Sequence, residues 1–176
     1  MLENFFVKVL NLKNIPRQGW KEKLEMEDVE SVADHTYLTA VMSMVFSDMQ
    51  NLNTEKIVKM ALLHDLAESI TGDITPDKIT KEKKNKIETD AIKNILQNLP
   101  SNISQTYFKI WNEYQENYTS EAILLHEIDK LEMAFQAKSY QSQEISDKKI
   151  ISFLQPAINN IKNKKVKEVL SKFLEQ

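Results

Sequence analysis

A shortage of glycine and proline constrains the fold of this chain more than any other feature of its sequence. Only 2 Gly and 4 Pro occur among 176 residues, so long stretches contain no residue that breaks a helix. These stretches are rich in Leu, Ile, Lys, Glu and Met, which favour helices, and none has the alternating apolar and polar pattern that is typical of a strand. The sequence therefore predicts an all-α fold.

Capping residues and apolar periodicity predict where the helices lie. Ser31 followed by Asp34 is typical of a capping box, which predicts a helix over 31–50. That helix is apolar nearly all round, so we expect it to be central and buried. The segment 14–30 contains Pro16 and Gly19 and is predicted to be mostly loop. Further helices are expected over 2–13 and over 54–70, the second ended by Gly72. A short helix is expected to start at Thr75–Pro76, and another helix is expected to end near Leu99. The last helices are expected over 103–117, 119–142 and 147–174, with a break at Pro156.

Composition limits the classes of function. Hydrophobic residues make up 41% and charged residues 28% of the chain, which is typical of one globular domain over 1–176. Cysteine is absent, which excludes disulfides, thiolate metal sites and cysteine nucleophiles. No secretion signal or membrane-spanning apolar run is visible, so a cytoplasmic protein without a membrane partner is expected. The net charge of −3 argues against a nucleic-acid partner, and the lysines at 162, 164, 165 and 167 are interpreted as a solvated helix face.

Histidines and acidic residues in the most apolar helices point to a metal site. His35 begins the 31–50 helix, His64 and Asp65 lie in the 54–70 helix, and Asp129 lies on an apolar stripe of the 119–142 helix. Burying several unpaired ionisable groups is costly, and a shared cation compensates them together. Two His and two Asp ligands suit a borderline divalent ion such as Mn²⁺, Co²⁺, Ni²⁺, Fe²⁺ or Zn²⁺. The third histidine, His126, is interpreted as structural or peripheral, so one ion is expected rather than two.

These residues resemble the H…HD…D signature of the HD superfamily of metal-dependent phosphohydrolases. Their flanking segments are similar to those of the HD-domain 5′-deoxynucleotidases, five blocks in the same order within about 8–142, whereas the C-terminal segment carries no such motif. The blocks are IPRQGW at 15–20, ESVADH at 30–35, LHDLAE at 63–68, GDITP at 72–76 and DKLEM at 129–133. An all-helical HD-type bundle is the fold that this resemblance implies.

The resemblance also implies an activity and a set of roles. It implies a homodimer that hydrolyses deoxyribonucleoside 5′-monophosphates with one divalent ion, Mg²⁺ included among the candidates. The implied ligands are His35, His64, Asp65 and Asp129. The other implied roles are catalytic and substrate-side acids for Glu68 and Asp73, phosphate binding for Arg17, and shielding of the sugar 2′ position for Trp20.

The residues themselves support some of these roles and leave others open. Glu68 follows His64 by four positions, so on a helix it would lie on the same side, close enough to act on an attacking water. Arg17 is the one arginine among 23 Lys and Arg residues, and its planar fork suits a phosphate. Trp20 is equally compatible with a role as a core anchor.

Other functions remain compatible with the same signature. The alternatives within enzymes are a guanosine tetraphosphate pyrophosphohydrolase and a deoxynucleoside triphosphate triphosphohydrolase. Both need more cationic groups to hold extra phosphates, which the lysines at 78, 81, 83 and 84 could supply. A catalytically silent metal-binding helical module is the alternative outside enzymes.

Overall fold

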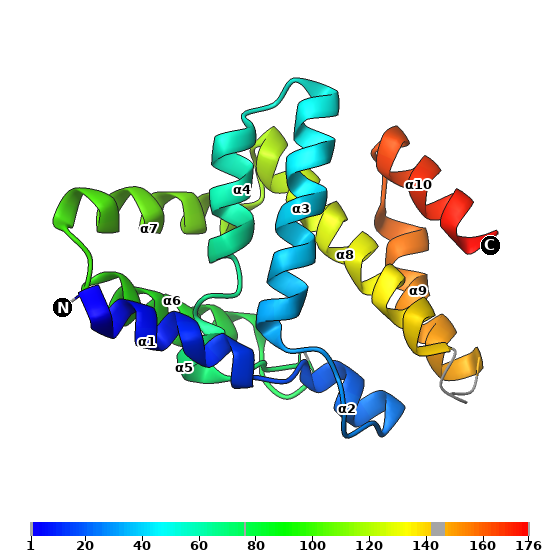
Figure 1. Ribbon diagram of the computed structural model, residues 1–176, viewed down its shortest axis with the longest axis horizontal. Helices are drawn as coiled ribbons and strands as arrows, with labels where there is room; N and C mark the ends of the chain where they lie inside the picture. Colours follow the sequence, from blue (N-terminus) through cyan, green and yellow to red (C-terminus); the bar gives the residue numbers. More distant parts are fainter. Residues whose placement is uncertain (1, 76, 142–146, 176) are drawn as a thin grey trace.

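Three helices pack side by side at the centre of the computed structural model: α3 (Val32–Gln50), α4 (Thr54–Leu63) and α8 (Ser120–Gln141) (Figure 1). The structure describes residues 2–75, 77–141 and 147–175, and within these ranges it contains helices and a single isolated β-bridge between Pro16 and Ser31. The all-α prediction is therefore confirmed. The other helices are α1 (Leu2–Asn11), the 3-10 helix η1 (Leu12–Asn14), α2 (Gln18–Leu24), α5 (Glu68–Thr71), α6 (Lys81–Leu96), α7 (Ser101–Glu116), α9 (Asp147–Asn160) and α10 (Lys164–Leu174).

The start of α3 is fixed by the capping box that the sequence predicts. The Ser31 hydroxyl accepts a hydrogen bond from the Asp34 backbone N–H at 3.2 Å, and the Asp34 carboxylate accepts one from the Ser31 N–H at 2.9 Å. Two of the unpaired N–H groups at the helix start are satisfied in this way. The cap sets the first turn of α3, which contains His35, at a defined position in the core.

The helix predicted over 54–70 is interrupted. Helix α4 ends at Leu63, a turn covers 64–67, and α5 begins at Glu68. The imidazole Nδ1 of His64 lies 2.6 Å from the carbonyl oxygen of Ala61, which in a continuing helix would accept the N–H of Asp65. The chain then tightens, with the N–H of Leu66 bonded to the carbonyl of Leu63. Periodicity alone could not reveal this interruption, because it depends on a side-chain hydrogen bond.

The segment 14–30, predicted to be mostly loop, also contains helix α2, which sequence reasoning missed. Trp20 and Leu24 lie one helical turn apart, and both are buried in a second apolar cluster with Ala137, Tyr140, Ile150 and Phe153. This burial outweighs the helix-breaking tendency of Gly19. The helix ends at Glu25, whose backbone is left-handed with φ of 59°.

The break predicted at Pro156 was also wrong. Pro156 lies inside α9, and the chain leaves the helical path only after Asn160. The Glu127 carboxylate accepts the backbone N–H groups of Lys162 and Asn163 at 3.1 and 2.9 Å, and the Asn163 side chain then caps α10. A contact from α8 thus decides where this helix pair bends.

One predicted helix start falls partly outside the described residues. Pro76, the second residue of the Thr75–Pro76 pair, is not described, and the next helix, α6, begins at Lys81 with Thr80 as its cap. No helix in the described part of the chain is long and apolar enough to cross a membrane.

Candidate metal centre and active site

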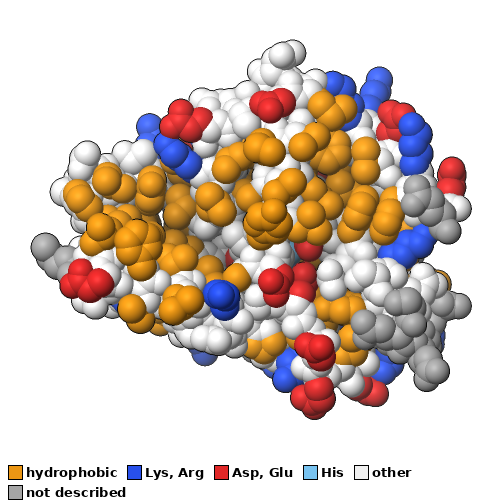
Figure 2. Space-filling model, in the orientation of Figure 1, with side chains coloured by type: hydrophobic (Ala, Val, Ile, Leu, Met, Phe, Trp, Pro, Cys, Tyr) orange, Lys and Arg blue, Asp and Glu red, His pale blue; other side chains and the backbone are white. Residues whose placement is uncertain are grey.

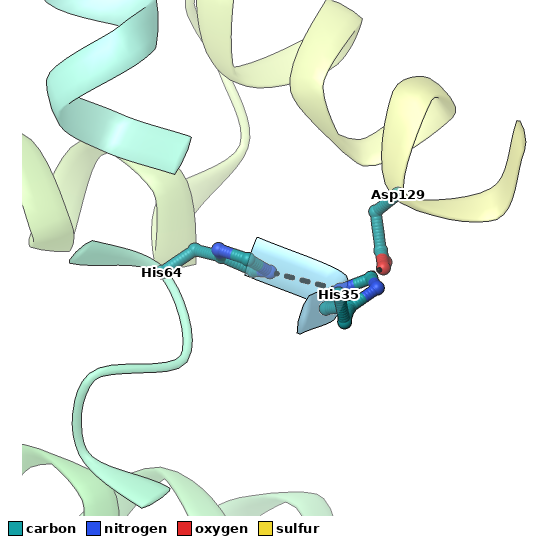
Figure 3. A group of neighbouring side chains, drawn as sticks. All are labelled: His35, His64 and Asp129. Atoms are coloured by element: carbon teal, nitrogen blue, oxygen red, sulfur yellow. Dashed lines mark hydrogen bonds and ion pairs between the residues drawn. The ribbon is translucent and has the colours of Figure 1, made fainter. Parts of the chain in front are cut away.

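Side chains from α3, α8 and the turn after α4 converge at one point. His35 Nε2 lies 3.3 Å from His64 Nε2 and 3.3 Å from Asp129 Oδ1 (Figure 3). Asp65 joins them, with Oδ2 at 3.1 Å from His64 Nε2 and 3.7 Å from His35 Nε2. The turn that ends α4 brings Asp65 and His64 to the same point although they are adjacent in sequence. The structure therefore places ligand atoms of His35, His64 and Asp129 within 4.8 Å of one another, and it places Asp65, the fourth residue that the sequence suggested, beside the two histidines.

The outer nitrogen of each imidazole is held by an acceptor. His35 Nδ1 lies 2.6 Å from Glu132 Oε2, and His64 Nδ1 lies 2.6 Å from the Ala61 carbonyl oxygen. Acceptors at both Nδ1 atoms favour a proton there and leave the Nε2 lone pairs facing each other across 3.3 Å. Two lone pairs so close are favourable only with a positive group between or beside them. This donor set fits a divalent cation.

Glu132 is a site residue that sequence reasoning missed. It is fully buried on α8, one turn beyond Asp129, and its second oxygen, Oε1, has no hydrogen-bond partner among the described residues. A fully buried carboxylate is costly unless it is paired, and His35 is its partner here. The available signal was a glutamate three positions after Asp129 on a helix with little exposed surface.

The electrostatics of the centre favour positive charge. Burial and Arg17 lower the pKa of His35, but hydrogen bonds to Asp129 and Glu132 outweigh them and raise it to about 10. Burial by itself would raise the pKa of Asp65 and Asp129, yet the neighbouring histidines and Arg17 hold both well below their ordinary value. The carboxylates therefore stay ionised, and they attract either protons on the histidines or a metal cation.

Glu68 and Asp73 lie in the wall of the cavity above this centre. Glu68 is almost completely buried at the start of α5, and its Oε2 has no hydrogen-bond partner in the described part of the chain. Burial raises the pKa of Glu68 well above its ordinary value, and the charges of Asp65 and Asp73 raise it further. Asp73 Oδ2 accepts the Gln18 backbone N–H at 2.7 Å. A carboxylate with a raised pKa and a free oxygen is suited to proton transfer.

Arg17 reaches the same centre from the residue before α2. Its Nη1 lies 3.3 Å from Asp65 Oδ2, and its backbone N–H donates to the Glu30 carbonyl at 3.0 Å. The guanidinium also lies within electrostatic reach of Asp73, Glu68 and Asp129. It forms part of the cavity wall.

Trp20 is both a core residue and a part of the cavity wall. The centroid of its ring lies 4.1 Å from that of the Phe153 ring and 5.4 Å from that of the Tyr140 ring, which it meets edge on. The indole N–H donates to Glu30 Oε1 at 2.7 Å, and the residue is only 1% exposed. The sequence left two roles open for Trp20, a core anchor and a shield of the sugar 2′ position, and its place in the structure is compatible with both.

His126 stays outside the group of converging ligands. Its Nε2 donates to the Tyr114 carbonyl oxygen at 3.0 Å, and its ring stacks on the Tyr114 ring at 4.1 Å. Burial lowers the pKa of His126. The imidazole is therefore neutral at physiological pH and forms part of the cavity wall.

The cavity has a volume of about 570 Å³. Part of its wall comes from α6 and α7 and includes Lys84, Glu88 and Tyr114. A second hollow of about 600 Å³, which is almost entirely apolar, lies between α1, α3, α4 and α7 and includes none of the converging ligands. Only the first hollow combines space for a small molecule with groups that perform chemistry.

The fold and the converging histidines and aspartates define an HD-domain protein. The model of the HD domain family matches residues 9–172, so the chain belongs to this family. The match includes α9 and most of α10, whereas the sequence motifs end near residue 142.

Relatives of known name align along nearly the whole chain. The "5′-deoxynucleotidase HDDC2" proteins of Xenopus laevis and Homo sapiens are each 36% identical to it, over 99% and 97% of this chain and 87% and 83% of their own lengths. Among solved structures, the PH0347 protein from Pyrococcus horikoshii OT3 superposes with a TM-score of 0.79 at 31% identity, covering 99% of this chain and 96% of that protein.

Proposed function

We propose that this chain is a 5′-deoxynucleotidase, which hydrolyses deoxyribonucleoside 5′-monophosphates to a deoxyribonucleoside and inorganic phosphate. The observation that carries the proposal is the convergence of His35, His64, Asp65 and Asp129 beneath a cavity that also contains Arg17 and Glu68. The names of the relatives support this substrate class. A volume of about 570 Å³ is within the range of small-molecule sites. The proposal keeps the cytoplasmic location expected from the sequence.

The proposed cofactor is one divalent ion held by His35, His64, Asp65 and Asp129, with Mn²⁺, Co²⁺, Ni²⁺, Fe²⁺, Zn²⁺ and Mg²⁺ as candidates. When bound, such an ion supplies Lewis acidity that neutralises phosphate charge and makes a water molecule easier to deprotonate. Glu132 and the Ala61 carbonyl orient the two imidazoles toward it.

The chain's own residues would bind the phosphate and transfer the protons. Arg17 binds the phosphate and balances its charge. Glu68 accepts a proton from the water whose oxygen attacks phosphorus, and its unpartnered Oε2 is the atom available for this role. The bond from phosphorus to the 5′ oxygen breaks, and that oxygen takes up the proton that Glu68 accepted, which leaves Glu68 ionised again. Asp73, tied to the start of α2 through the Gln18 N–H, lines the substrate side.

Trp20 is proposed to select the sugar. Its indole is held on three sides by Phe153, Tyr140 and Glu30, so it cannot move aside easily. A rigid wall beside the sugar would disfavour an added 2′-hydroxyl and so favour deoxyribonucleotides.

A homodimer is proposed from the apolar face of the molecule. The exposed apolar side chains of α3 recur on one side of the helix, and α1 and α4 add more beside the 600 Å³ hollow. Figure 2 shows hydrophobic side chains gathered over this face. The exposed large hydrophobic residues of α1, α3 and α4 are Leu2, Phe6, Val7, Leu10, Tyr37, Met44, Val45, Met49 and Leu62. Contiguous apolar patches of this kind are typical of interfaces. Light scattering at micromolar concentration should give a dimer mass, and a monomer mass would contradict the proposal.

A polyphosphate hydrolase is the second candidate, because Lys23, Lys81 and Lys84 also line the cavity. The deciding experiment measures product release from matched ribo- and deoxyribonucleoside mono- and triphosphates and guanosine tetraphosphate, each with several divalent ions. We expect inorganic phosphate from deoxyribonucleoside monophosphates. Release of pyrophosphate or triphosphate would favour the second candidate. Metal binding without any turnover would indicate a silent module.

A further inference from the structure

Tyr114 on α7 holds its ring in a fixed position beside the metal centre. One face of the ring stacks on His126, with an angle of 13° between the planes, and the ring meets His64 edge on with centroids 5.5 Å apart. The backbone of Tyr114 is held as well, because its carbonyl accepts the His126 Nε2–H. The residue is only 7% exposed, and it forms part of the cavity wall. A side chain fixed in this way points its hydroxyl in one direction.

The hydroxyl of Tyr114 forms no hydrogen bond with any described residue. It is also not among the fully buried polar atoms that lack a partner, so it is in contact with solvent. The charged groups within its electrostatic reach are Asp129 and Asp65, then Arg17 and Glu88. A nearly buried tyrosine usually finds a partner for its O–H. Here the partner must come from the cavity.

We propose that the Tyr114 hydroxyl donates a hydrogen bond to a phosphate oxygen of the bound nucleotide. This inference rests on the proposed function. A phosphate held at the metal centre would lie beside Asp65, Asp129 and Arg17, and the charges of these three groups also act on the phenol. Arg17 supplies charge, whereas the phenol is a neutral donor with a fixed direction. Tyr114 would therefore be a substrate-binding residue that orients the phosphate for attack.

The test compares Tyr114→Phe with a matched control, Tyr118→Phe. Tyr114→Phe keeps the ring and its stacking on His126, and it removes only the oxygen. Tyr118 lies in the exposed connection between α7 and α8 and does not line the cavity, so the same atom is removed outside the cavity wall. For each Mn²⁺-loaded protein, we would measure metal content, melting temperature, the Kd for inorganic phosphate by calorimetry, and kcat/KM for a deoxyribonucleoside monophosphate.

A hydrogen bond to a charged group predicts a loss of roughly 10- to 100-fold in kcat/KM for Tyr114→Phe. The affinity of Tyr114→Phe for inorganic phosphate should fall at least several-fold, while its metal content and melting temperature stay at parental values. Tyr118→Phe should keep parental values in all four measurements. Parental phosphate affinity and turnover in Tyr114→Phe would overturn the inference. Loss of bound Mn²⁺ from Tyr114→Phe would also overturn it, because the hydroxyl would then belong to the metal centre itself. So would a fall in kcat/KM for the nucleotide with an unchanged Kd for inorganic phosphate, because the hydroxyl would then contact the nucleoside.

The phosphate measurement separates this inference from the proposed function. If the parental protein cleaves no deoxyribonucleoside monophosphate, the proposed function fails. The Kd for inorganic phosphate in the Tyr114→Phe and parental proteins would still decide whether the hydroxyl contacts phosphate.

Discussion

Glu132 Oε2 lies 2.6 Å from Nδ1 of His35, and both side chains are completely buried. The carboxylate holds the imidazole in the orientation that points Nε2 at His64 and Asp129. Partners of this kind typically change metal affinity by about 10- to 100-fold when they are removed. We therefore expect Glu132→Ala to weaken metal binding by roughly that factor and Glu132→Gln, which retains an acceptor, to weaken it less.

Metal titration by calorimetry checks this prediction, with Glu168→Gln on the exposed face of α10 as the control. Parental metal affinity in Glu132→Ala would show that His35 keeps its orientation without the carboxylate.

Occupation of the metal centre should stabilise the fold. An ion at 100 times its Kd adds about 2.7 kcal/mol to the free energy of unfolding. For a chain of this length, that corresponds to a rise of roughly 5–10 °C in melting temperature. Asp129→Asn, similar in size but without the charge, should lose most of that rise. Thermal scans with and without Mn²⁺ measure it, and a full rise in the variant would remove Asp129 from the ligand set.

Glu68→Gln should separate catalysis from metal binding. The glutamine keeps the size of the side chain but cannot accept a proton, and positioned general-base catalysis contributes about 10²–10⁴ in rate. We expect near-parental metal content and nucleotide affinity with turnover lowered by at least ~10². Loss of metal would make Glu68 a ligand, and retained turnover would shift proton acceptance to Asp73.

The two roles of Trp20 should separate by the size of the replacement. Trp20→Ala removes an indole that is 1% exposed and should destabilise the fold by about 3–5 kcal/mol. Trp20→Phe keeps much of the packing on Phe153 but widens the cavity wall. We expect Trp20→Phe to raise turnover of ribonucleotides relative to deoxyribonucleotides, as measured by kcat/KM for matched pairs. An unchanged ratio in a folded variant would leave Trp20 with a structural role only.

The sequence by itself determined the features that depend on neighbouring residues. The scarcity of Gly and Pro predicted a helical chain, and Ser31 with Asp34 predicted the start of α3 one residue before its first helical position. The four proposed ligands were also visible as candidates, because histidines and aspartates stand out in helices that are otherwise apolar. Such features can be recognised from the sequence alone, because the residues that cause them are close together in the chain.

Tertiary structure decided what depends on distant residues. Glu132 and His35 are 97 positions apart, so their pairing has no local signal. The same holds for α2, which folds because Trp20 packs on Phe153, and for the bend after Asn160, which the Glu127 carboxylate stabilises. Even the end of α4 depends on the direction of the His64 ring. Burial and side-chain hydrogen bonds across the fold outweigh local propensities of about 1 kcal/mol or less, apart from proline.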